Sequence, residues 1–134
     1  MADISFTKPL SFQLSITEID DNLPSFKTEI TVKANYLSSD FQFSAREVWF
    51  DCIEWEKFIN SLEDISRDEE VKLADLDNKL IISLRIVENS FKFYLTYKSS
   101  SISNSNSVFF FEKILDEDEF APFKESFLSF PIWW

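Results

Sequence analysis

Apolar and polar positions alternate through the first fifty residues of the chain, and this pattern predicts antiparallel β-strands. One strand is expected over residues 10–16, where aliphatic and aromatic side chains alternate with Ser and Gln. A turn at residues 20–24 leads to a second strand over residues 26–34, with one apolar and one charged face. A third strand is expected from Phe41 to about Phe50. The pattern is typical of a sheet with one face on the core and one face in water.

After Asp51 the apolar positions follow a helical period, which predicts a helix from Cys52 to Ile65. The apolar side chains at helical spacing are Trp55, Phe58, Ile59, Leu62 and Ile65. Asp51 suits the N-cap, and Glu54 three residues later gives the spacing of a capping box. Cys52 falls in the first turn, where a thiolate is favoured. Because the chain has no His to activate this thiol, we do not expect it to be catalytic.

Strands are expected again from residue 71 onward, over residues 71–73, 80–86 and 91–97. The turns between them contain Asn78 and Asn89, and Asn tolerates the left-handed backbone region better than other residues with a Cβ. Residues 99–107 contain mostly Ser and Asn and predict a polar loop. The run of Phe from 109 to 111 predicts a short strand that is buried on both faces.

A second helical pattern opens with four acids, Asp116 to Glu119, and continues with Phe120, Phe123 and Phe127. Pro122 belongs in the first turn of a helix, so the helix is expected either to start late or to begin with a distorted turn. Together these elements predict one α+β domain over residues 1–134, with largely antiparallel meander sheets and two helices. Its two halves, each a set of strands and then a helix, reflect either an internal duplication or a shared packing need.

The composition excludes several kinds of catalytic site, because the 134 residues include no His, no Gly and one Cys. No Ser-His-Asp or Cys-His arrangement can form, and no zinc site can use imidazole. Phosphate-binding loops in their usual form require Gly. We therefore expect no enzyme, no cofactor and no metal. The 16 Phe and 4 Trp are expected to pack in the core rather than to stack on a ligand.

The formal net charge of −11 favours some partners over others. It disfavours nucleic acids and anionic membranes, and it favours either simple solubility or a basic protein partner. No apolar run reaches the roughly 18 residues of a membrane helix, and the first residues lack the pattern of a secretory signal. With one Cys and no export signal, we expect a cytoplasmic protein.

Acidic clusters at a turn and at a helix start are the candidate contacts for a protein partner. They contain Glu18, Asp20 and Asp21, and Asp116, Glu117, Asp118 and Glu119. Carboxylates at such places usually serve solvation or helix capping, which is the alternative role. The apolar end of the chain, Ile132, Trp133 and Trp134, is expected either to dock on the core or to associate with a second chain. Docking within a monomer is the favoured arrangement.

The element order gives the chain a resemblance to a known family. It rests on the helix residues Asp51, Trp55, Phe58, Ile59, Leu62 and Ile65, on Phe109, Phe110, Phe111 and Glu112, and on the acidic start of the last helix. From Leu10 to about Ser129 the chain resembles small immunity proteins of bacterial contact-dependent toxin systems, of the wall-associated-protein (WapI-like) type. This resemblance implies a cytoplasmic protein without catalytic activity that binds one cognate toxin domain and blocks it. It carries over no site residues.

Three other classes of function remain open at the level of sequence. An acidic mimic of nucleic acid, inhibiting a DNA-processing defence enzyme, requires regularly spaced carboxylates on one extended face, whereas here the acids are interleaved with 13 basic residues. A carboxylate-dependent hydrolase requires a deep pocket that holds two acids with raised pKa values. A structural or self-assembling protein would associate through its aromatic tail.

Overall fold

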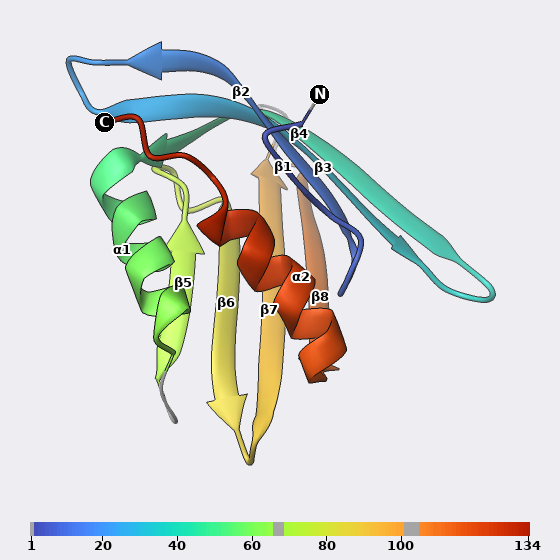
Figure 1. The fold of residues 1–134 in the computed structure, drawn as a ribbon. Helices are drawn as coiled ribbons and strands as arrows, with labels where there is room; N and C mark the ends of the chain where they lie inside the picture. Colours follow the sequence, from blue (N-terminus) through green and yellow to red (C-terminus); the bar gives the residue numbers. More distant parts are fainter. Residues whose placement is uncertain (1, 66–68, 101–104) are drawn as a thin grey trace.

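The computed structural model describes residues 2–65, 69–100 and 105–134, and in them it has two four-stranded antiparallel sheets and two helices (Figure 1). The first sheet contains β1 (Ile4–Phe6), β2 (Ser11–Asp20), β3 (Ser25–Asn35) and β4 (Asp40–Asp51), and α1 (Cys52–Glu63) follows it. The second sheet contains β5 (Glu70–Ala74), β6 (Leu80–Val87), β7 (Ser90–Ser100) and β8 (Asn106–Leu115), followed by α2 (Glu117–Leu128). The predicted α+β fold of antiparallel meanders and two helices is confirmed. No described helix is long and apolar enough to cross a membrane.

In the first sheet the strands are neighbours in chain order, and their apolar faces are buried as the alternation predicts. Strand β1, in which Ile4 pairs with Leu14 and Phe6 with Phe12, was not predicted from the sequence. A strand of three residues contains only one full period of alternation, so its pattern gives no signal of its own. The pairing of β3 with β4 shifts register opposite Glu29, and Glu47 on the longer side has a φ of 59°. This is the geometry of a β-bulge.

Helix α1 begins at the predicted residue and Asp51 is its N-cap, as predicted, whereas the side chain of Glu54 pairs with Lys57. Asp51 Oδ1 accepts hydrogen bonds from the backbone N–H groups of Ile53 and Glu54, at 2.8 and 3.0 Å. The helix ends at Glu63 and not at Ile65, because Asp64 leaves the helical conformation with φ −127° and ψ 59°. The predicted apolar side chains within the helix are buried, with Trp55 completely enclosed, and Ile65 beyond its end is partly buried.

The second sheet corrects two expectations. Residues 99 and 100 belong to β7 and pair with residues 107 and 106 of β8, so the two strands extend into both ends of the predicted polar loop. The centre of that loop lies outside the described residues. Phe110 is 57% exposed, so the run of Phe is not buried on both faces. Because only one face of β8 lies on the core and consecutive side chains point to opposite faces, Phe111 is buried and Phe110 is not.

Helix α2 begins directly after Asp116 and contains Pro122 in its interior, so it does not start late. Pro122 is exposed, whereas Phe120, Phe123 and Phe127 are buried on the opposite side. The missing N–H of Pro122 deprives the fourth residue before it of a helical hydrogen bond. The apolar face therefore determines where this helix lies.

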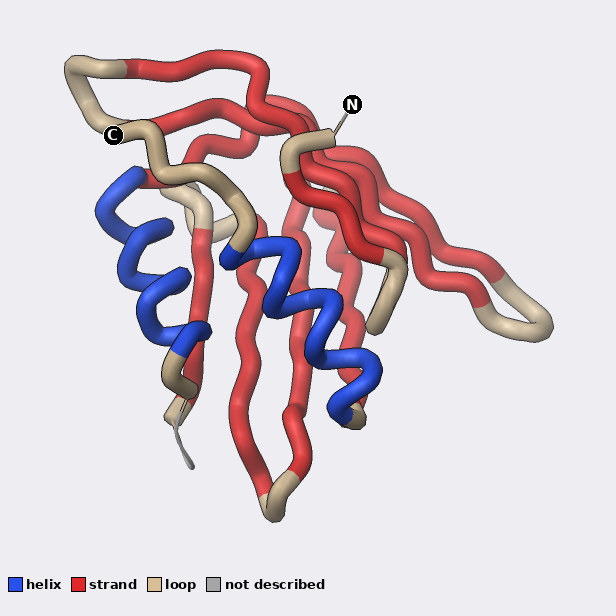
Figure 2. Tube along the Cα trace, viewed as in Figure 1, coloured by secondary structure: helices blue, strands red, loops and turns tan. Residues whose placement is uncertain are grey.

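Both helices lie on one side of the second sheet, beneath the first sheet in the view of Figure 2. Each helix packs against the edge strand that opens the other half, α1 against β5 and α2 against β1. Phe123 joins the two sheets, because its ring centroid lies 5.3 Å from those of both Phe6 and Phe93. Phe127 joins the two helices through Trp55 and Phe58, at 5.7 and 5.2 Å. A single cluster of aromatic side chains thus connects all the layers.

Candidate partner-binding surface

The first predicted acidic cluster borders the turn between β2 and β3. Asp20 Oδ1 accepts hydrogen bonds from the backbone N–H groups two and three residues later, at 3.0 and 3.3 Å. This arrangement stabilises the turn. Glu18 pairs with Lys27 Nζ at 3.0 Å, and this contact raises the pKa of Lys27. Asp21 is exposed in the turn itself.

The second predicted acidic cluster forms the start of α2. Asp116 is the N-cap, and its Oδ1 accepts a hydrogen bond from the backbone N–H of Glu119 at 2.9 Å. The carboxylate of Glu119 pairs with Lys113 of β8. Glu117 and Asp118 are exposed in the first turn, where negative charge interacts favourably with the helix dipole. These acids therefore stabilise the helix and its attachment to β8.

The two acidic clusters lie at opposite ends of the molecule. In Figure 1 the turn between β2 and β3 is at the upper left, and the first turn of α2 is at the lower right. One partner surface of ordinary size does not include both. The structure therefore separates two groups of residues that the sequence analysis proposed together.

The C-terminal segment lies across the beginning of β3. Phe130 is buried, and the rings of Trp133 and Trp134 lie 5.4 and 5.9 Å from the ring of Phe26. Trp134 Nε1 donates a hydrogen bond to Glu56 Oε2 of α1 at 3.1 Å. The tail is thus docked on its own chain, against both β3 and α1. Both Trp side chains keep a large exposed fraction, 41% and 36%.

The docked tail lies next to the first acidic cluster. Ile19 pairs with Phe26, the residue that both Trp rings contact. The turn between β2 and β3 is hydrogen-bonded to the start of α1, because the N–H of Cys52 donates to Pro24 O at 2.9 Å. Asp21 is close enough to Cys52 to contribute to the raised pKa of its thiol. Turn, tail and helix start therefore form one continuous surface, seen at the upper left of Figure 1.

We call this surface the tail face. Its exposed apolar side chains are Ile19, Leu23, Ile53, Ile132, Trp133 and Trp134. Its carboxylates are Asp20, Asp21, Glu54 and Glu56. Lys57 is a neighbouring cation, and it pairs with Glu54 at 3.2 Å. An apolar centre with a charged rim is the usual anatomy of a protein–protein interface.

Sequence reasoning missed Ile53, Glu54 and Glu56 as members of this surface. One local signal identifies Ile53, since it lies outside the buried stripe of α1 and yet is a large apolar residue. No local signal brings Glu56 to Trp134, because 78 residues separate them and only the folded chain places them together.

A cleft of about 460 Å³ beside the tail face gathers three carboxylates, Asp51, Glu54 and Asp75. Asp51 caps α1, and Asp75 Oδ1 accepts a hydrogen bond from the N–H of Leu80 at 2.9 Å. Glu54 pairs with Lys57. Each of the three therefore has a partner that accounts for its position. Within the described ranges, no group of three or more Cys, Asp or Glu side chains is placed to hold a metal ion.

Cys52 lies in the first turn of α1, where the helix dipole favours a thiolate, but the structure gives the opposite result. Its side chain is buried, and this burial, together with the carboxylates of Asp51 and Asp21, raises the pKa of the thiol. A buried thiol with a raised pKa is a weak nucleophile. The structure therefore gives no support for a reactive cysteine at this position.

No model of a known protein family matches the chain, and no curated protein is significantly similar to it in sequence.

Proposed function

We propose that this protein binds a basic protein partner through the tail face and blocks that partner by occlusion. This is the function that the resemblance to WapI-like immunity proteins implies, with a cognate toxin domain as the partner and the cytoplasm as the place of action. The proposal includes no catalytic step, no cofactor and no nucleic acid.

The observation that carries the proposal is the pair of exposed Trp side chains on the tail face, with Trp134 hydrogen-bonded to the carboxylate of Glu56. Trp is among the residues that contribute most to binding energy when a partner buries them. Trp134 is already held by Phe26 and Glu56, so its binding requires little further loss of side-chain freedom. The indole rings also offer faces to the Lys or Arg side chains of a basic partner.

The charge of the tail face supports the choice of a basic partner. Asp20 and Asp21 lie at its rim, and they add to the field of a chain with a net charge of −11. Rim charges accelerate association and disfavour wrong partners, while the apolar centre sets the rate of dissociation. The arrangement therefore supports specific, charge-steered recognition of a positively charged protein.

The test uses the toxin domain that the proposed function implies as the partner. We expect the adjacent upstream gene to encode a large secreted protein with a variable C-terminal domain. That domain, purified, is expected to bind this protein and to lose its toxic activity on binding. Calorimetry gives the affinity, and an assay of the domain with and without this protein gives the inhibition.

Two substitutions test the tail face. Trp133→Ala is expected to weaken binding at least tenfold, as expected for a central aromatic side chain. Asp21→Lys is expected to slow association severalfold with little change in dissociation. Asp118→Lys is the matched control, because it makes the same charge change at the opposite end of the molecule and should leave both rates nearly unchanged.

The reverse result would place the contact at the other end of the molecule: binding reduced by Asp118→Lys and unchanged by Trp133→Ala. Turnover of a small substrate by the purified protein, abolished when one acid is changed, would replace the occlusion model with a catalytic one. Sedimentation of the protein alone gives its molar mass and so distinguishes a monomeric inhibitor from a self-assembling protein. A doubled molar mass that depends on Trp133 would favour the self-assembling protein.

A further inference from the structure

A groove runs along the edge of β8, away from the tail face. Two adjoining cavities, of about 680 and 200 Å³, share Ala34, Tyr36 and Phe111 in their walls. Together they are lined by six consecutive residues of β8, 108–113. Because consecutive side chains of a strand point to opposite faces, a cavity lined by all of them lies along the edge of the strand. We call this cavity the β8 groove.

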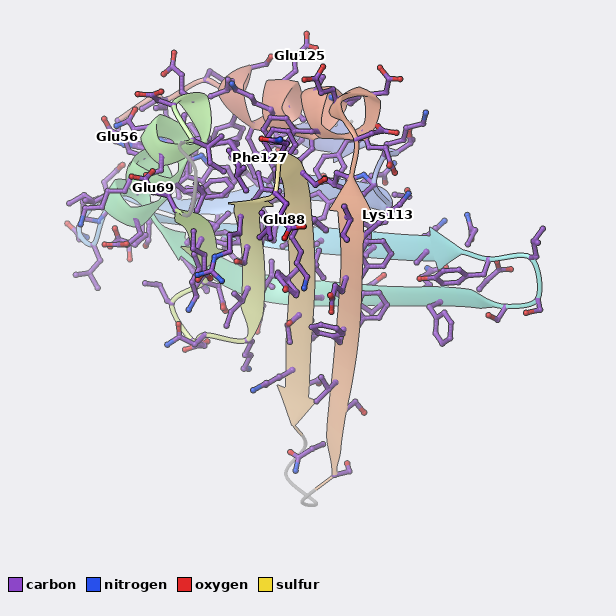
Figure 3. The ribbon with its side chains drawn as sticks, turned by 90° about the horizontal axis from the view of Figure 1, so that it is seen from below. Glu56, Glu69, Glu88, Lys113, Glu125 and Phe127 are labelled. Carbon is purple, nitrogen blue, oxygen red and sulfur yellow. The ribbon has the colours of Figure 1, made fainter. Side chains whose placement is uncertain are left out.

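The wall opposite β8 belongs to the first sheet. It contains residues 33–36 at the end of β3, with residues 7 and 9–11 before and at the start of β2. In the view of Figure 3, β7 and β8 pass across the strands of β3 and β4, and Lys113 on β8 lies near this crossing. β8 is the last strand in the order β5-β6-β7-β8, so within the described part of the chain no strand pairs with this edge. Its outward backbone groups therefore face the groove.

Residues 108–111 of this edge carry apolar side chains and none of the residues that normally prevent a further strand from pairing. Val108 and Phe110 are 61% and 57% exposed. Across the groove Tyr36 and Phe41 are also exposed and contact each other, with ring centroids 5.9 Å apart. Sheet edges are normally protected by charged side chains, proline or a covering segment, and residues 108–111 contain neither a charge nor a proline. An added strand would cover these apolar side chains.

The charges of the groove indicate what kind of segment would fit. Its walls contain Lys33, Lys113 and Glu112, a positive balance in a chain of net charge −11. Glu112 pairs with Lys92 at 3.2 Å, and Lys113 pairs with Glu119. Among the described residues no carboxylate forms an ion pair with Lys33. The groove is therefore complementary to a segment that carries a negative charge near Lys33.

We propose that the β8 groove binds an extended peptide segment of a partner, which adds to the second sheet as a strand beside β8. Six residues of β8 give a contact length of about 20 Å, enough for a strand of ordinary length. Alternate side chains of the segment would be apolar and pack between Phe111 and Ala34, and an acidic side chain would pair with Lys33. A second copy of this chain is disfavoured as the occupant, because it brings another eleven negative charges.

The test uses a defined peptide. The probe is a capped peptide of about eight residues in which Val and Phe alternate with Thr and one central Thr is replaced by Glu. Binding is measured by calorimetry, and hydrogen exchange of the protein amides locates the contact. We expect slowed exchange in β8 and not in β5, the other edge strand of the same sheet. A peptide with N-methyl groups at alternate amides is expected to bind at least tenfold more weakly, since it cannot donate the strand hydrogen bonds.

A charge exchange tests the role of Lys33. Lys33→Glu is expected to lower the affinity for the Glu-containing peptide about fivefold. It should raise, by a similar factor, the affinity for the same peptide with Lys in place of Glu. Lys72→Glu, which makes the same change on β5, is the matched control and should alter neither affinity. Phe110→Lys changes an exposed position and leaves the core intact. It is expected to lower the affinity for both peptides, because a charged side chain on a sheet edge disfavours the pairing of a further strand.

Four results would overturn the proposal. They are the absence of binding at millimolar peptide, equal affinity for the N-methylated peptide, protection confined to residues outside β8, and an unchanged preference in Lys33→Glu. Slowed exchange of β8 that depends on protein concentration, with a doubled mass and without peptide, would assign the edge to a second copy of the chain instead. The tail-face variant Trp133→Ala should bind the peptide normally, so this site and the proposed occlusion function succeed or fail separately.

Discussion

At the scale of single residues, the chain has to make tight turns without glycine. Four of the residues that the structure describes have positive φ: Asn78 (56°), Asn89 (66°), Glu88 (50°) and Glu47 (59°). The two Asn residues are those that the sequence analysis expected in this conformation, because Asn tolerates it best among residues with a Cβ. The two Glu residues were not predicted. Nothing in a Glu side chain favours the left-handed region, so the strand pairing on either side imposes it.

The turn between β6 and β7 gives the first testable prediction. Glu88 and Asn89 are its two central residues and both have positive φ, as in a type I′ turn (Figure 3 labels Glu88). Glu88→Asn is expected to raise the free energy of unfolding by about 0.5–1 kcal/mol, measured by urea denaturation. Asp77→Asn removes the same charge from a residue without positive φ and should change stability by less than about 0.5 kcal/mol. Equal effects of the two substitutions would contradict the backbone explanation.

The buried thiol of Cys52 gives a prediction about pH. Its pKa is raised in the folded protein, first by burial, above the value of about 8.5 that an unfolded chain has. As pH rises, the unfolded chain therefore loses this proton before the folded protein does. The contribution of the protonated thiol to the free energy of unfolding is complete below about pH 8.5 and is lost as pH rises through the pKa of the folded protein. Urea denaturation between about pH 7.5 and 9.5, below the titration of the lysines, should show stability falling. Cys52→Val should reduce that slope, and a slope identical to that of the unmodified protein would refute the assignment.

At the scale of elements, the spacing of apolar residues predicted the helices and strands better than the residues that locally disfavour them did. Pro122 in the interior of α2 costs about 3 kcal/mol. Burial of Phe120, Phe123 and Phe127 contributes about 1.5–3 kcal/mol for each side chain, which exceeds this cost. The helix therefore forms through the proline, and the expectation that it starts late was wrong. The polar run at 99–107 shows the same effect, because pairing of β7 with β8 continues into residues that locally favour a loop.

Replacement of Pro122 is therefore a stabilising substitution. Pro122→Ala should raise the free energy of unfolding by about 1–3 kcal/mol, since it restores a helical N–H and removes the ring clash. The side chain is exposed, so no packing is lost. Thermal and urea denaturation provide the measurement. Pro24→Ala, in the turn before β3, is the control, because it restores no helical hydrogen bond and should give no comparable gain.

At the scale of the whole molecule, the excess of negative charge predicts how a partner is met. With the cognate domain proposed above, the association rate should fall about tenfold as ionic strength rises from about 0.05 to 0.5 M. Asp21→Lys should flatten this dependence, whereas Asp118→Lys should leave its slope near that of the unmodified protein. Stopped-flow fluorescence of the exposed Trp side chains provides the measurement. An association rate that is independent of ionic strength would exclude charge steering.

The candidate site was predictable in part. The acids of the turn and the apolar tail were identified because clustered carboxylates and a terminal pair of Trp residues are visible in the sequence. Their neighbourhood was not, because Ile19, Phe26 and Trp133 come together only through strand pairing and the return of the chain after α2. The β8 groove was not predictable either. Phe110 was predicted to lie in the core, and it is exposed because only one face of the second sheet is covered by the helices.

The sequence alone determined the fold class and most of the elements and core positions, though not β1 or the exposure of Phe110, because apolar periodicity is a local property that any packed arrangement must respect. It also excluded chemistry that requires His or Gly. Only the tertiary structure decided which strands lie at edges, which ion pairs the acids form and which side chains meet across the chain. Those outcomes depend on contacts between distant residues, such as the hydrogen bond from Trp134 to Glu56, and no local pattern records them.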